Sequence, residues 1–179
     1  MIRRAVIEDA GAIAAIHVRA WQEAYAGIVP ADFLAALSVE KRTEFWKREL
    51  GTTGSIVLAS VEDGKVVGWA SGGASRESGA VGECEIYAIY VSPKLWRQRI
   101  GIRLMKGIEE ALRPSSDITL WVLSENVRAI DFYRSLGYEF DGTEKSVQLG
   151  GVSLDEIRLR KKWPNKAPEP TPVAVMPRA

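Results

Sequence analysis

The fold is decided by residues 124–138, which read SENVRAIDFYRSLGY. Apolar residues recur there at helical spacing and a glycine follows them, so a helix is predicted from Asn126 to Leu136, ended by Gly137. The preceding residues, 118–123, are almost all apolar, which is typical of a strand buried on both faces. The sequence therefore predicts a buried strand that leads directly into an amphipathic helix.

Hydrophobic periodicity divides the rest of the chain into strands and helices. The predicted strands are 3–7, 55–61, 65–72, 83–91, 118–123, 138–149 and 152–161. The predicted helices are 10–25, a short stretch from residue 31, 39–50, 98–113 and 126–136. Residues 83–123 form a strand–helix–strand unit, so a right-handed parallel crossover is expected inside an otherwise antiparallel sheet. The predicted fold class is α+β: a mixed, mostly antiparallel sheet of about seven strands, with helices on both faces and a central βαβ crossover.

Length and composition are those of one globular domain followed by a tail. Residues 1–163 are predicted to form a single domain, because that length can bury a proper core. Residues 164–179 contain five of the eight prolines and no sustained apolar pattern, so a disordered extension is expected there.

Charge and composition exclude several classes of protein. Lys and Arg number 24 against 23 for Asp and Glu, which argues against a nucleic-acid-binding protein. No apolar run has membrane-spanning length and the N-terminus lacks a signal-peptide core, so a cytoplasmic protein without membrane contact is expected. Cys84 and His17 are the single cysteine and histidine, so neither an intrachain disulfide nor a Cys/His zinc cage can form, and no metal is expected. Cys84 is predicted to be a buried small residue.

Two segments carry residue types suited to chemistry. The first is KLWRQRIG, residues 94–101, where three cations lie at a predicted helix start. A helix N-terminus presents free backbone N–H groups and a partial positive charge, which suit a pyrophosphate, and Gly101 lets the backbone come close. The alternative is an ordinary helix start with solvated basic residues.

The second segment is the helix that begins at Asn126. Asn126 and Tyr133 are seven residues apart and project from nearly one face. An asparagine can hold an amide or carbonyl of a bound chain, and a phenol can protonate a leaving thiolate. The alternative is that Asn126 is only an N-cap and Tyr133 only a core aromatic residue.

The pattern N-x-x-A-x-x-F-Y-x-x-x-G-Y after an apolar strand resembles the C-terminal acetyl-coenzyme A motif of the GNAT superfamily of N-acetyltransferases. Residues 85–93, EIYAIYVSP, resemble the strand that leads to the family's pyrophosphate loop, and the order of elements is also similar. The family's loop usually reads Gln/Arg-x-x-Gly-x-Gly/Ala. Here Trp96 replaces the first residue of the loop and Arg99 its first glycine.

The resemblance implies that acetyl-coenzyme A is the co-substrate, and it implies which residues bind it. Main-chain groups of the strand would pair with the pantetheine arm: Ile89, Tyr90 and Val91. Backbone N–H groups of the loop would hold the pyrophosphate: Arg97, Gln98, Arg99, Ile100, Gly101 and Ile102. Asn126 would touch the pantetheine or thioester region, and Tyr133 would act as the general acid near the sulfur.

An alkyl ammonium must lose a proton before it can attack a thioester, so a base is expected. Strand alternation places Glu83, Glu85, Ile89 and Val91 on one face, and Glu85 resembles a recurrent acidic position of the family. Glu85 is the first candidate base and Glu83 the second, with a solvated or salt-bridged carboxylate as the alternative. His17 lies on the apolar stripe of the first helix, so we expect it to be packed and hydrogen-bonded rather than a base.

Trp21 and Tyr25 precede a turn that covers the acceptor pocket in relatives, so they are predicted either to bind the acceptor or to belong to the core. The predicted function is transfer of acetyl to a primary amine of a small molecule by direct attack in a ternary complex. The alternatives are acetylation of a protein N-terminus or lysine, and a coenzyme A-binding regulatory domain without turnover. A homodimer is expected from the family resemblance.

Overall fold

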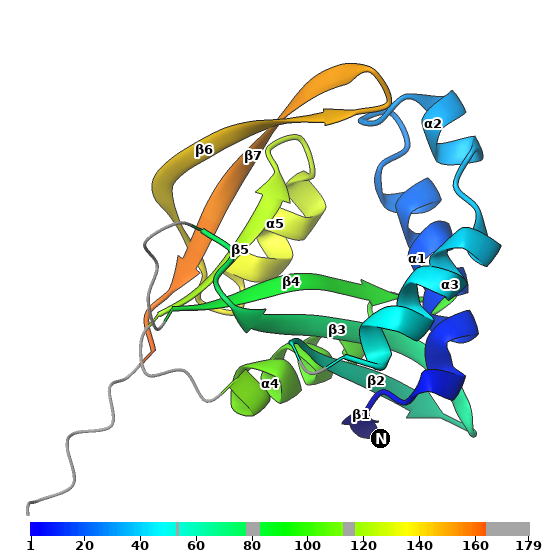
Figure 1. The fold of residues 1–179 in the computed structure, drawn as a ribbon. Helices are drawn as coiled ribbons and strands as arrows, with labels where there is room; N and C mark the ends of the chain where they lie inside the picture. The colour runs from blue at the N-terminus through cyan, green and yellow to red at the C-terminus, as the bar shows by residue number, and fades with distance from the viewer. Residues whose placement is uncertain (53, 78–82, 113–116, 164–179) are drawn as a thin grey trace, which may run out of the picture.

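The computed structural model describes residues 1–52, 54–77, 83–112 and 117–163, so the predicted tail at 164–179 lies outside the described residues. The helices are α1 (Ala10–Ala24), α2 (Ala31–Ala35), α3 (Val39–Leu50), α4 (Ile100–Leu112) and α5 (Val127–Arg134). The strands are β1 (Ile2–Arg4), β2 (Ile56–Glu62), β3 (Lys65–Ala74), β4 (Cys84–Val91), β5 (Ile118–Leu123), β6 (Glu139–Leu149) and β7 (Val152–Lys161) (Figure 1). Short 3-10 helices occur at Ile7–Asp9 and Pro93–Leu95.

The strands form one sheet in the order β1-β2-β3-β4-β5-β7-β6. Every neighbouring pair is antiparallel except β4 and β5, which are parallel and connected through α4. The predicted fold class, a mixed and mostly antiparallel α+β sheet with a central βαβ crossover, is confirmed. The first strand is shorter than predicted, because Asp9 accepts hydrogen bonds from Arg3 and from the Val6 N–H and turns the chain into a 3-10 helix.

Helices cover both faces of the sheet (Figure 1). The apolar ladder of α4, centred on Leu104, packs against one face, and Ile130 of α5 joins the same cluster. On the other face, Ile13 of α1 and Trp46 of α3 pack against Trp69 of β3. Each of these helices is amphipathic in sequence, so burial of one stripe accounts for its place on the sheet.

The parallel pair in the middle of the sheet is short and then opens (Figure 1). β4 and β5 are registered over three residue pairs, of which the last is Ile86 with Leu120, and the described residues contain no later pair. Directly afterwards, Tyr87 is an extra residue in β4, because Ile86 pairs with Gly72 of β3 while Ala88 pairs with the residue before that glycine. Such a bulge bends a strand. Residues 87–91 of β4 therefore leave the side of β5 and border a gap.

The bulge also reverses which side chains of β4 share a face. Ile86 and Ile89 both pack in the cluster under α4, whereas Tyr90 packs on the side of α1. The prediction that Glu85 shares a face with Ile89 and Val91 is therefore wrong, because the extra residue interrupts the two-residue alternation. Glu85 lies on the same side of the sheet as Tyr90.

Replacing Leu104 with alanine should destabilise the protein by about 2–5 kcal/mol, because its fully buried side chain fills the centre of the α4 cluster and the cavity left behind cannot collapse. Urea unfolding of both proteins measures this loss. The matched control is Lys106→Ala, an exposed position on the same helix, which should change stability by less than about 0.5 kcal/mol. A loss below about 1 kcal/mol for Leu104→Ala would contradict this description of the core.

Candidate active site

The turn between β4 and α4 contains two arginines with left-handed backbone. The φ angle is 66° at Arg97 and 59° at Arg99, and α4 begins at Ile100 rather than at the predicted Gln98. Turns that place left-handed residues beside a helix start direct successive N–H groups to one side, an arrangement that binds anions. The turn could therefore hold a pyrophosphate through its backbone, with the two guanidinium groups adding positive charge.

Trp96 ties the end of β4 to the start of α5. Its indole N–H donates to the Val91 carbonyl at 2.9 Å, and the guanidinium carbon of Arg128 lies 3.7 Å from the centre of the indole ring system. The hydrogen bond and the cation–π contact together connect the end of β4 to the first turn of α5. Trp96 stands at the loop position where the family resembled in sequence usually has Gln or Arg.

Packing against α5 requires glycine at position 101, in addition to the predicted close approach of the backbone to a pyrophosphate. A Cβ atom on Gly101 would lie 3.2 Å from the ring of Phe132. Glycine therefore lets the first turn of α4 approach α5 closely, which a side chain there would prevent.

Asn126 caps α5 and lies beside the gap. Its side-chain oxygen accepts the Ala129 N–H at 3.2 Å, and the residue is 8% exposed. Asn126 therefore acts as the N-cap of α5. Its side-chain NH₂ group takes part in no hydrogen bond among the described residues, so the cap is compatible with the predicted contact to a bound carbonyl.

Tyr133 lies on α5 with its ring packed against Phe132 and Tyr138, at centroid distances of 5.3 and 6.2 Å. Burial raises the pKa of the Tyr133 phenol well above its usual value, and the nearby Tyr25 raises it further. Among the described residues, its hydroxyl takes part in no hydrogen bond. The phenol is thus neutral and its proton is uncommitted, as a proton donor requires.

Trp21 and Tyr25 come together with Tyr90 on the α1 side of the gap. The Trp21 indole N–H donates to the Tyr90 hydroxyl at 2.8 Å, and the hydroxyls of Tyr25 and Tyr90 are 3.4 Å apart. Burial raises the pKa of both phenols. The two residues that sequence placed on the acceptor side are therefore tied to β4 where it has separated from β5.

Glu85 is held in an ion pair with Arg76. Its carboxylate accepts the backbone N–H of Arg76 at 2.9 Å and two hydrogen bonds from the guanidinium group, and the residue is 1% exposed. It lies opposite Thr119, in the part of the sheet where β4 and β5 are still paired. The sequence analysis offered two interpretations of Glu85, a catalytic base or a solvated or salt-bridged carboxylate. In this structure Glu85 is a salt-bridged carboxylate. The second candidate, Glu83, lies 3.5 Å from the Arg160 guanidinium.

His17 is packed as predicted but is not hydrogen-bonded as predicted. Its ring stacks on Tyr90 at a centroid distance of 5.1 Å and also contacts Trp69. Neither ring nitrogen has a hydrogen-bond partner among the described residues. Burial, with a smaller effect from Arg42, lowers the pKa of His17 to about 3, so the imidazole is neutral. Cys84 is half-buried rather than buried, and burial raises the pKa of its thiol.

The sequence analysis singled out no aromatic or charged side chains on β5, β6 and β7, the strands on the other side of the gap. The ammonium of Lys145 lies 3.8 Å from the centre of the Trp121 ring system, a cation–π contact. Trp121 is also directly opposite Arg158 in the pairing of β5 with β7. Leu123, two residues further, is registered with Glu156 and packs with Tyr25. The alternating pattern of β7 predicted a strand, but it did not show which charged side chains would face the gap.

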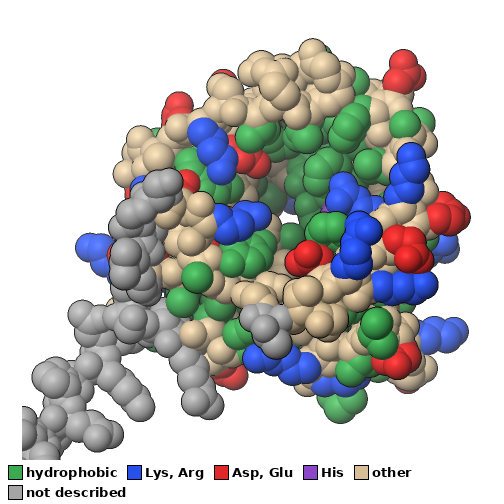
Figure 2. Space-filling model, in the orientation of Figure 1, with side chains coloured by type: hydrophobic (Ala, Val, Ile, Leu, Met, Phe, Trp, Pro, Cys, Tyr) green, Lys and Arg blue, Asp and Glu red, His purple; other side chains and the backbone are tan. Residues whose placement is uncertain are grey.

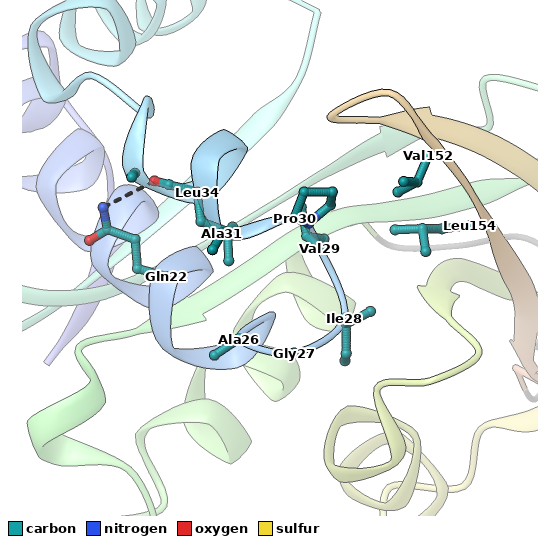
Figure 3. Close-up of a pocket in the computed structure, with 11 residues that line it drawn as sticks. Gln22, Ala26, Gly27, Ile28, Val29, Pro30, Ala31, Leu34, Val152 and Leu154 are labelled. Carbon is teal, nitrogen blue, oxygen red and sulfur yellow. Dashed lines mark hydrogen bonds between the residues drawn. The ribbon is translucent and has the colours of Figure 1, made fainter.

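A pocket of about 780 Å³ adjoins this region. It lies between the α1–α2 turn and the first residues of β7, and its lining is mostly apolar: Gln22, Ala26, Gly27, Ile28, Val29, Pro30, Ala31, Leu34, Ala35, Val152 and Leu154 (Figure 3). The space-filling view shows a hollow between the α1–α2 side and the β6–β7 side, with hydrophobic side chains on its walls (Figure 2). Val29, Leu34 and Leu154 of the pocket lining belong to the apolar cluster against which Trp21 and Tyr25 pack.

Neither a metal cluster nor a membrane-spanning helix occurs among the described residues. They contain no group of three or more His, Cys, Asp or Glu side chains that could hold a metal ion. None of the helices in the described ranges is long and apolar enough to cross a membrane.

Two solved structures with a similar fold are those of N-acetyltransferases. The PaiA N-acetyltransferase from Thermoplasma acidophilum, solved in complex with coenzyme A, has a TM-score of 0.72 at 20% identity, covering 91% of this chain and 98% of that one. A ribosomal-protein-alanine N-acetyltransferase from Brucella melitensis has a TM-score of 0.71 at 25% identity, covering 91% and 99%. These similarities confirm the fold expected from the sequence.

Sequence comparison gives the family. The profile of the acetyltransferase (GNAT) family matches residues 15–138. A relative from Bacillus subtilis (strain 168), the uncharacterized N-acetyltransferase YuaI, is 33% identical over 166 residues, covering 92% of each chain. The chain belongs to the GNAT acetyltransferase family, and the predicted enzyme class, an acetyl-coenzyme A-dependent acyltransferase, is confirmed.

Arg99→Gly should be more stable than Arg99→Ala by about 1 kcal/mol, because both variants lose the guanidinium but only glycine adopts a φ of 59° without strain. Thermal or urea unfolding of the pair measures the difference. At Lys106, inside α4, the order should reverse, with alanine the more stable by about 1 kcal/mol. Alanine equal to or better than glycine at position 99 would contradict the left-handed turn.

The stability of the protein should fall as pH is lowered from 7 to 5, in part because of His17. Its folded-state pKa of about 3 lies below its usual value of 6.5, so in this window the unfolded state binds the proton and stability is lost as pH falls. In His17→Phe that loss should be smaller by about 2 kcal/mol, measured by urea unfolding at the two pH values. Equal losses in the two proteins would show that the imidazole is not held neutral.

Proposed function

We propose that the protein is a cytoplasmic enzyme that transfers an acetyl group from acetyl-coenzyme A to a primary amine of a small molecule, by direct attack while both substrates are bound. The observation that carries this proposal is the gap between β4 and β5, with the neutral Tyr133 phenol on one side and the Trp21–Tyr25–Tyr90 aromatic residues on the other. Such a gap brings two substrates together from opposite faces of the sheet.

The cofactor would lie along the open edge of β4. Main-chain groups of residues 89–91 would pair with the pantetheine arm as an added strand does. Backbone N–H groups of residues 97–102 would hold the pyrophosphate, supported by the left-handed turn at Arg97 and Arg99. The Val91 carbonyl already accepts a hydrogen bond from the Trp96 indole N–H. We therefore assign the hydrogen bonds to the pantetheine arm chiefly to the main chain of Ile89 and to the side-chain amide of Asn126. The PaiA N-acetyltransferase structure, which was solved in complex with coenzyme A, supports coenzyme A as the ligand.

Tyr133 would supply the proton that the leaving thiolate needs. A thiolate expelled from the tetrahedral intermediate is a poor leaving group in an apolar site unless it is protonated. A backbone N–H near Ile89 would stabilise the oxyanion of that intermediate. Glu85, the first candidate base, is committed to Arg76, so in this proposal it anchors the start of β4 and the proton of the acceptor leaves by another group.

Acetylation of a protein N-terminus is the second candidate. It is supported by the 25% identity to the ribosomal-protein-alanine N-acetyltransferase, which covers 91% of this chain. An assay of thiol release from acetyl-coenzyme A, run with a panel of small amines and with peptides that have free N-termini, separates the two candidates. Coenzyme A binding without turnover on any member would instead favour a regulatory domain.

Tyr133→Phe should lower kcat by about 100-fold or more, because a positioned general acid contributes that much, while the affinity for coenzyme A changes little. Thiol-release kinetics and calorimetric titration with coenzyme A measure the two quantities. The control is Tyr138→Phe, which removes a buried hydroxyl that donates to Glu109 and should cost stability but not kcat. A wild-type kcat in Tyr133→Phe would rule out its role as the acid.

A further inference from the structure

Side chains of β5, β6 and β7 that point toward α1 form a surface that we call the acceptor face. Its members are Trp121 and Leu123 of β5, Lys145 and Val147 of β6, and Leu154, Glu156 and Arg158 of β7. Residues directly opposite each other in an antiparallel pair point to the same side of the sheet. Leu123, which packs with Tyr25 at the end of α1, is opposite Glu156. The Glu156 carboxylate therefore lies on the side of the sheet from which an acceptor would approach.

Glu156 is held much more weakly than the other carboxylates near this face. Glu85 and Asp141 each accept three hydrogen bonds. The carboxylate of Glu156 lies 3.6 Å from the Lys145 ammonium and, within the described ranges, takes part in no hydrogen bond. Its side chain is 22% exposed, which leaves it accessible to a second cation.

Glu156 is also level with the open part of the gap. It is opposite Leu123, three residues beyond the last β5 residue that pairs with β4, which is Leu120. Tyr25 lies near the same region, since its hydroxyl is 3.4 Å from that of Tyr90 and it packs against the apolar cluster that contains Leu123. Burial raises the pKa of Tyr25 and the charge of Glu156 raises it further, which agrees with a carboxylate near that hydroxyl.

We propose that Glu156 binds the ammonium group of the acceptor amine and takes the first proton from it. This assignment rests on the function proposed above and deepens it. A carboxylate that is only loosely paired can exchange its lysine for a substrate ammonium at little cost, whereas Glu85 would have to break three hydrogen bonds from Arg76. The neighbouring aromatic rings favour a cation in the same place.

Two groups, Glu156 and Tyr133, are then sufficient for all the proton transfers of the reaction. The ammonium passes one proton to the Glu156 carboxylate, directly or through water, and the free amine attacks the thioester carbonyl carbon. A nitrogen–carbon bond forms, and the carbon–sulfur bond breaks as the intermediate collapses. The sulfur takes the phenol proton of Tyr133, and the second nitrogen proton restores that phenol. Glu156 releases its proton to solvent, so one amide, one thiol and one proton leave the site.

The acceptor face also indicates which kind of substituent the acceptor amine has. Leu154 is two residues before Glu156 in β7, so the two side chains share a face about 7 Å apart. Leu154 also lines the apolar pocket at the α1–α2 turn (Figure 3). An amine bound at Glu156 can therefore place an alkyl or aryl group in that pocket. The acceptor class is a primary amine with an apolar substituent, in preference to a polyamine.

The test is steady-state thiol release at saturating acetyl-coenzyme A with hexylamine, 2-phenylethylamine, spermidine and a peptide with a free N-terminus. The two apolar amines should have the highest kcat/KM in the wild type. Glu156→Gln should lower kcat/KM for them by about tenfold or more, through KM because a charge-assisted contact is lost, and through kcat because glutamine cannot take the first proton. Calorimetric titration with coenzyme A should give the wild-type affinity and shows that the variant is folded.

Two further variants separate recognition from a structural role. Lys145→Met keeps a long side chain over Trp121 but removes the cation that competes for Glu156, so KM for the apolar amines should fall, opposite to Glu156→Gln. The matched control is Glu144→Gln: Glu144 is exposed and is registered with Ile157, which packs on the α4 side, so kinetics should be unchanged.

The outcomes distinguish this assignment from the function on which it rests. If the wild type releases no thiol with any acceptor, both the proposed function and the assignment fail. If the wild type acetylates amines but Glu156→Gln keeps its KM and kcat within about twofold, only the role of Glu156 is overturned. A preference for spermidine or for the peptide over both apolar amines would overturn the acceptor class.

Discussion

The structure depends on one constraint: β4 and β5 pair over only three residues and then separate. A strand edge in the middle of a sheet would normally be fully paired, because buried backbone groups that lose water need another partner. Here the bulge at Tyr87 turns β4 away, and the described residues contain no strand that takes the place of β5. An extended ligand is the natural occupant of such an edge.

In the function proposed above, the two openings of the gap receive different substrates. On the α4 and α5 side, the left-handed turn before Ile100, the Trp96–Arg128 contact and the half-buried phenol of Tyr133 suit a phosphate-bearing thioester. On the α1 side, aromatic residues and the loosely held Glu156 carboxylate suit a cationic amine. The chain is nearly neutral overall, so in this proposal the local placement of charge, rather than net charge, separates the two substrates.

Much of the fold could be predicted from the sequence. The helix at 39–50 and the strands at 118–123 and 152–161 have the predicted bounds, because hydrophobic periodicity and clear turn residues define them. The bulge at Tyr87 was not predicted, because a two-residue alternation of side chains does not indicate where a strand contains an extra residue. A signal was present in the neighbouring strand: Cβ atoms on Gly72 and Gly73 would lie 2.8 Å from the Glu85 carbonyl oxygen and 2.6 Å from the Tyr87 hydroxyl.

The candidate site was predicted less completely than the fold. Sequence identified the aromatic pair Trp21 and Tyr25, which the structure brings to Tyr90. It could not show that Arg76 neutralises Glu85, since that contact depends on the path of the chain after β3. Nor could it place Glu156, because the face that a strand residue occupies depends on its register with the strands beside it.

The central claim is that the open edge of β4 receives the arm of coenzyme A. Backbone amide chemical shifts, followed by NMR during titration with coenzyme A, test it most directly. We predict saturable changes concentrated in residues 87–91 of β4 and residues 97–102 of the turn. Saturation with the largest changes elsewhere in the sheet, or no saturable change at millimolar coenzyme A, would contradict it.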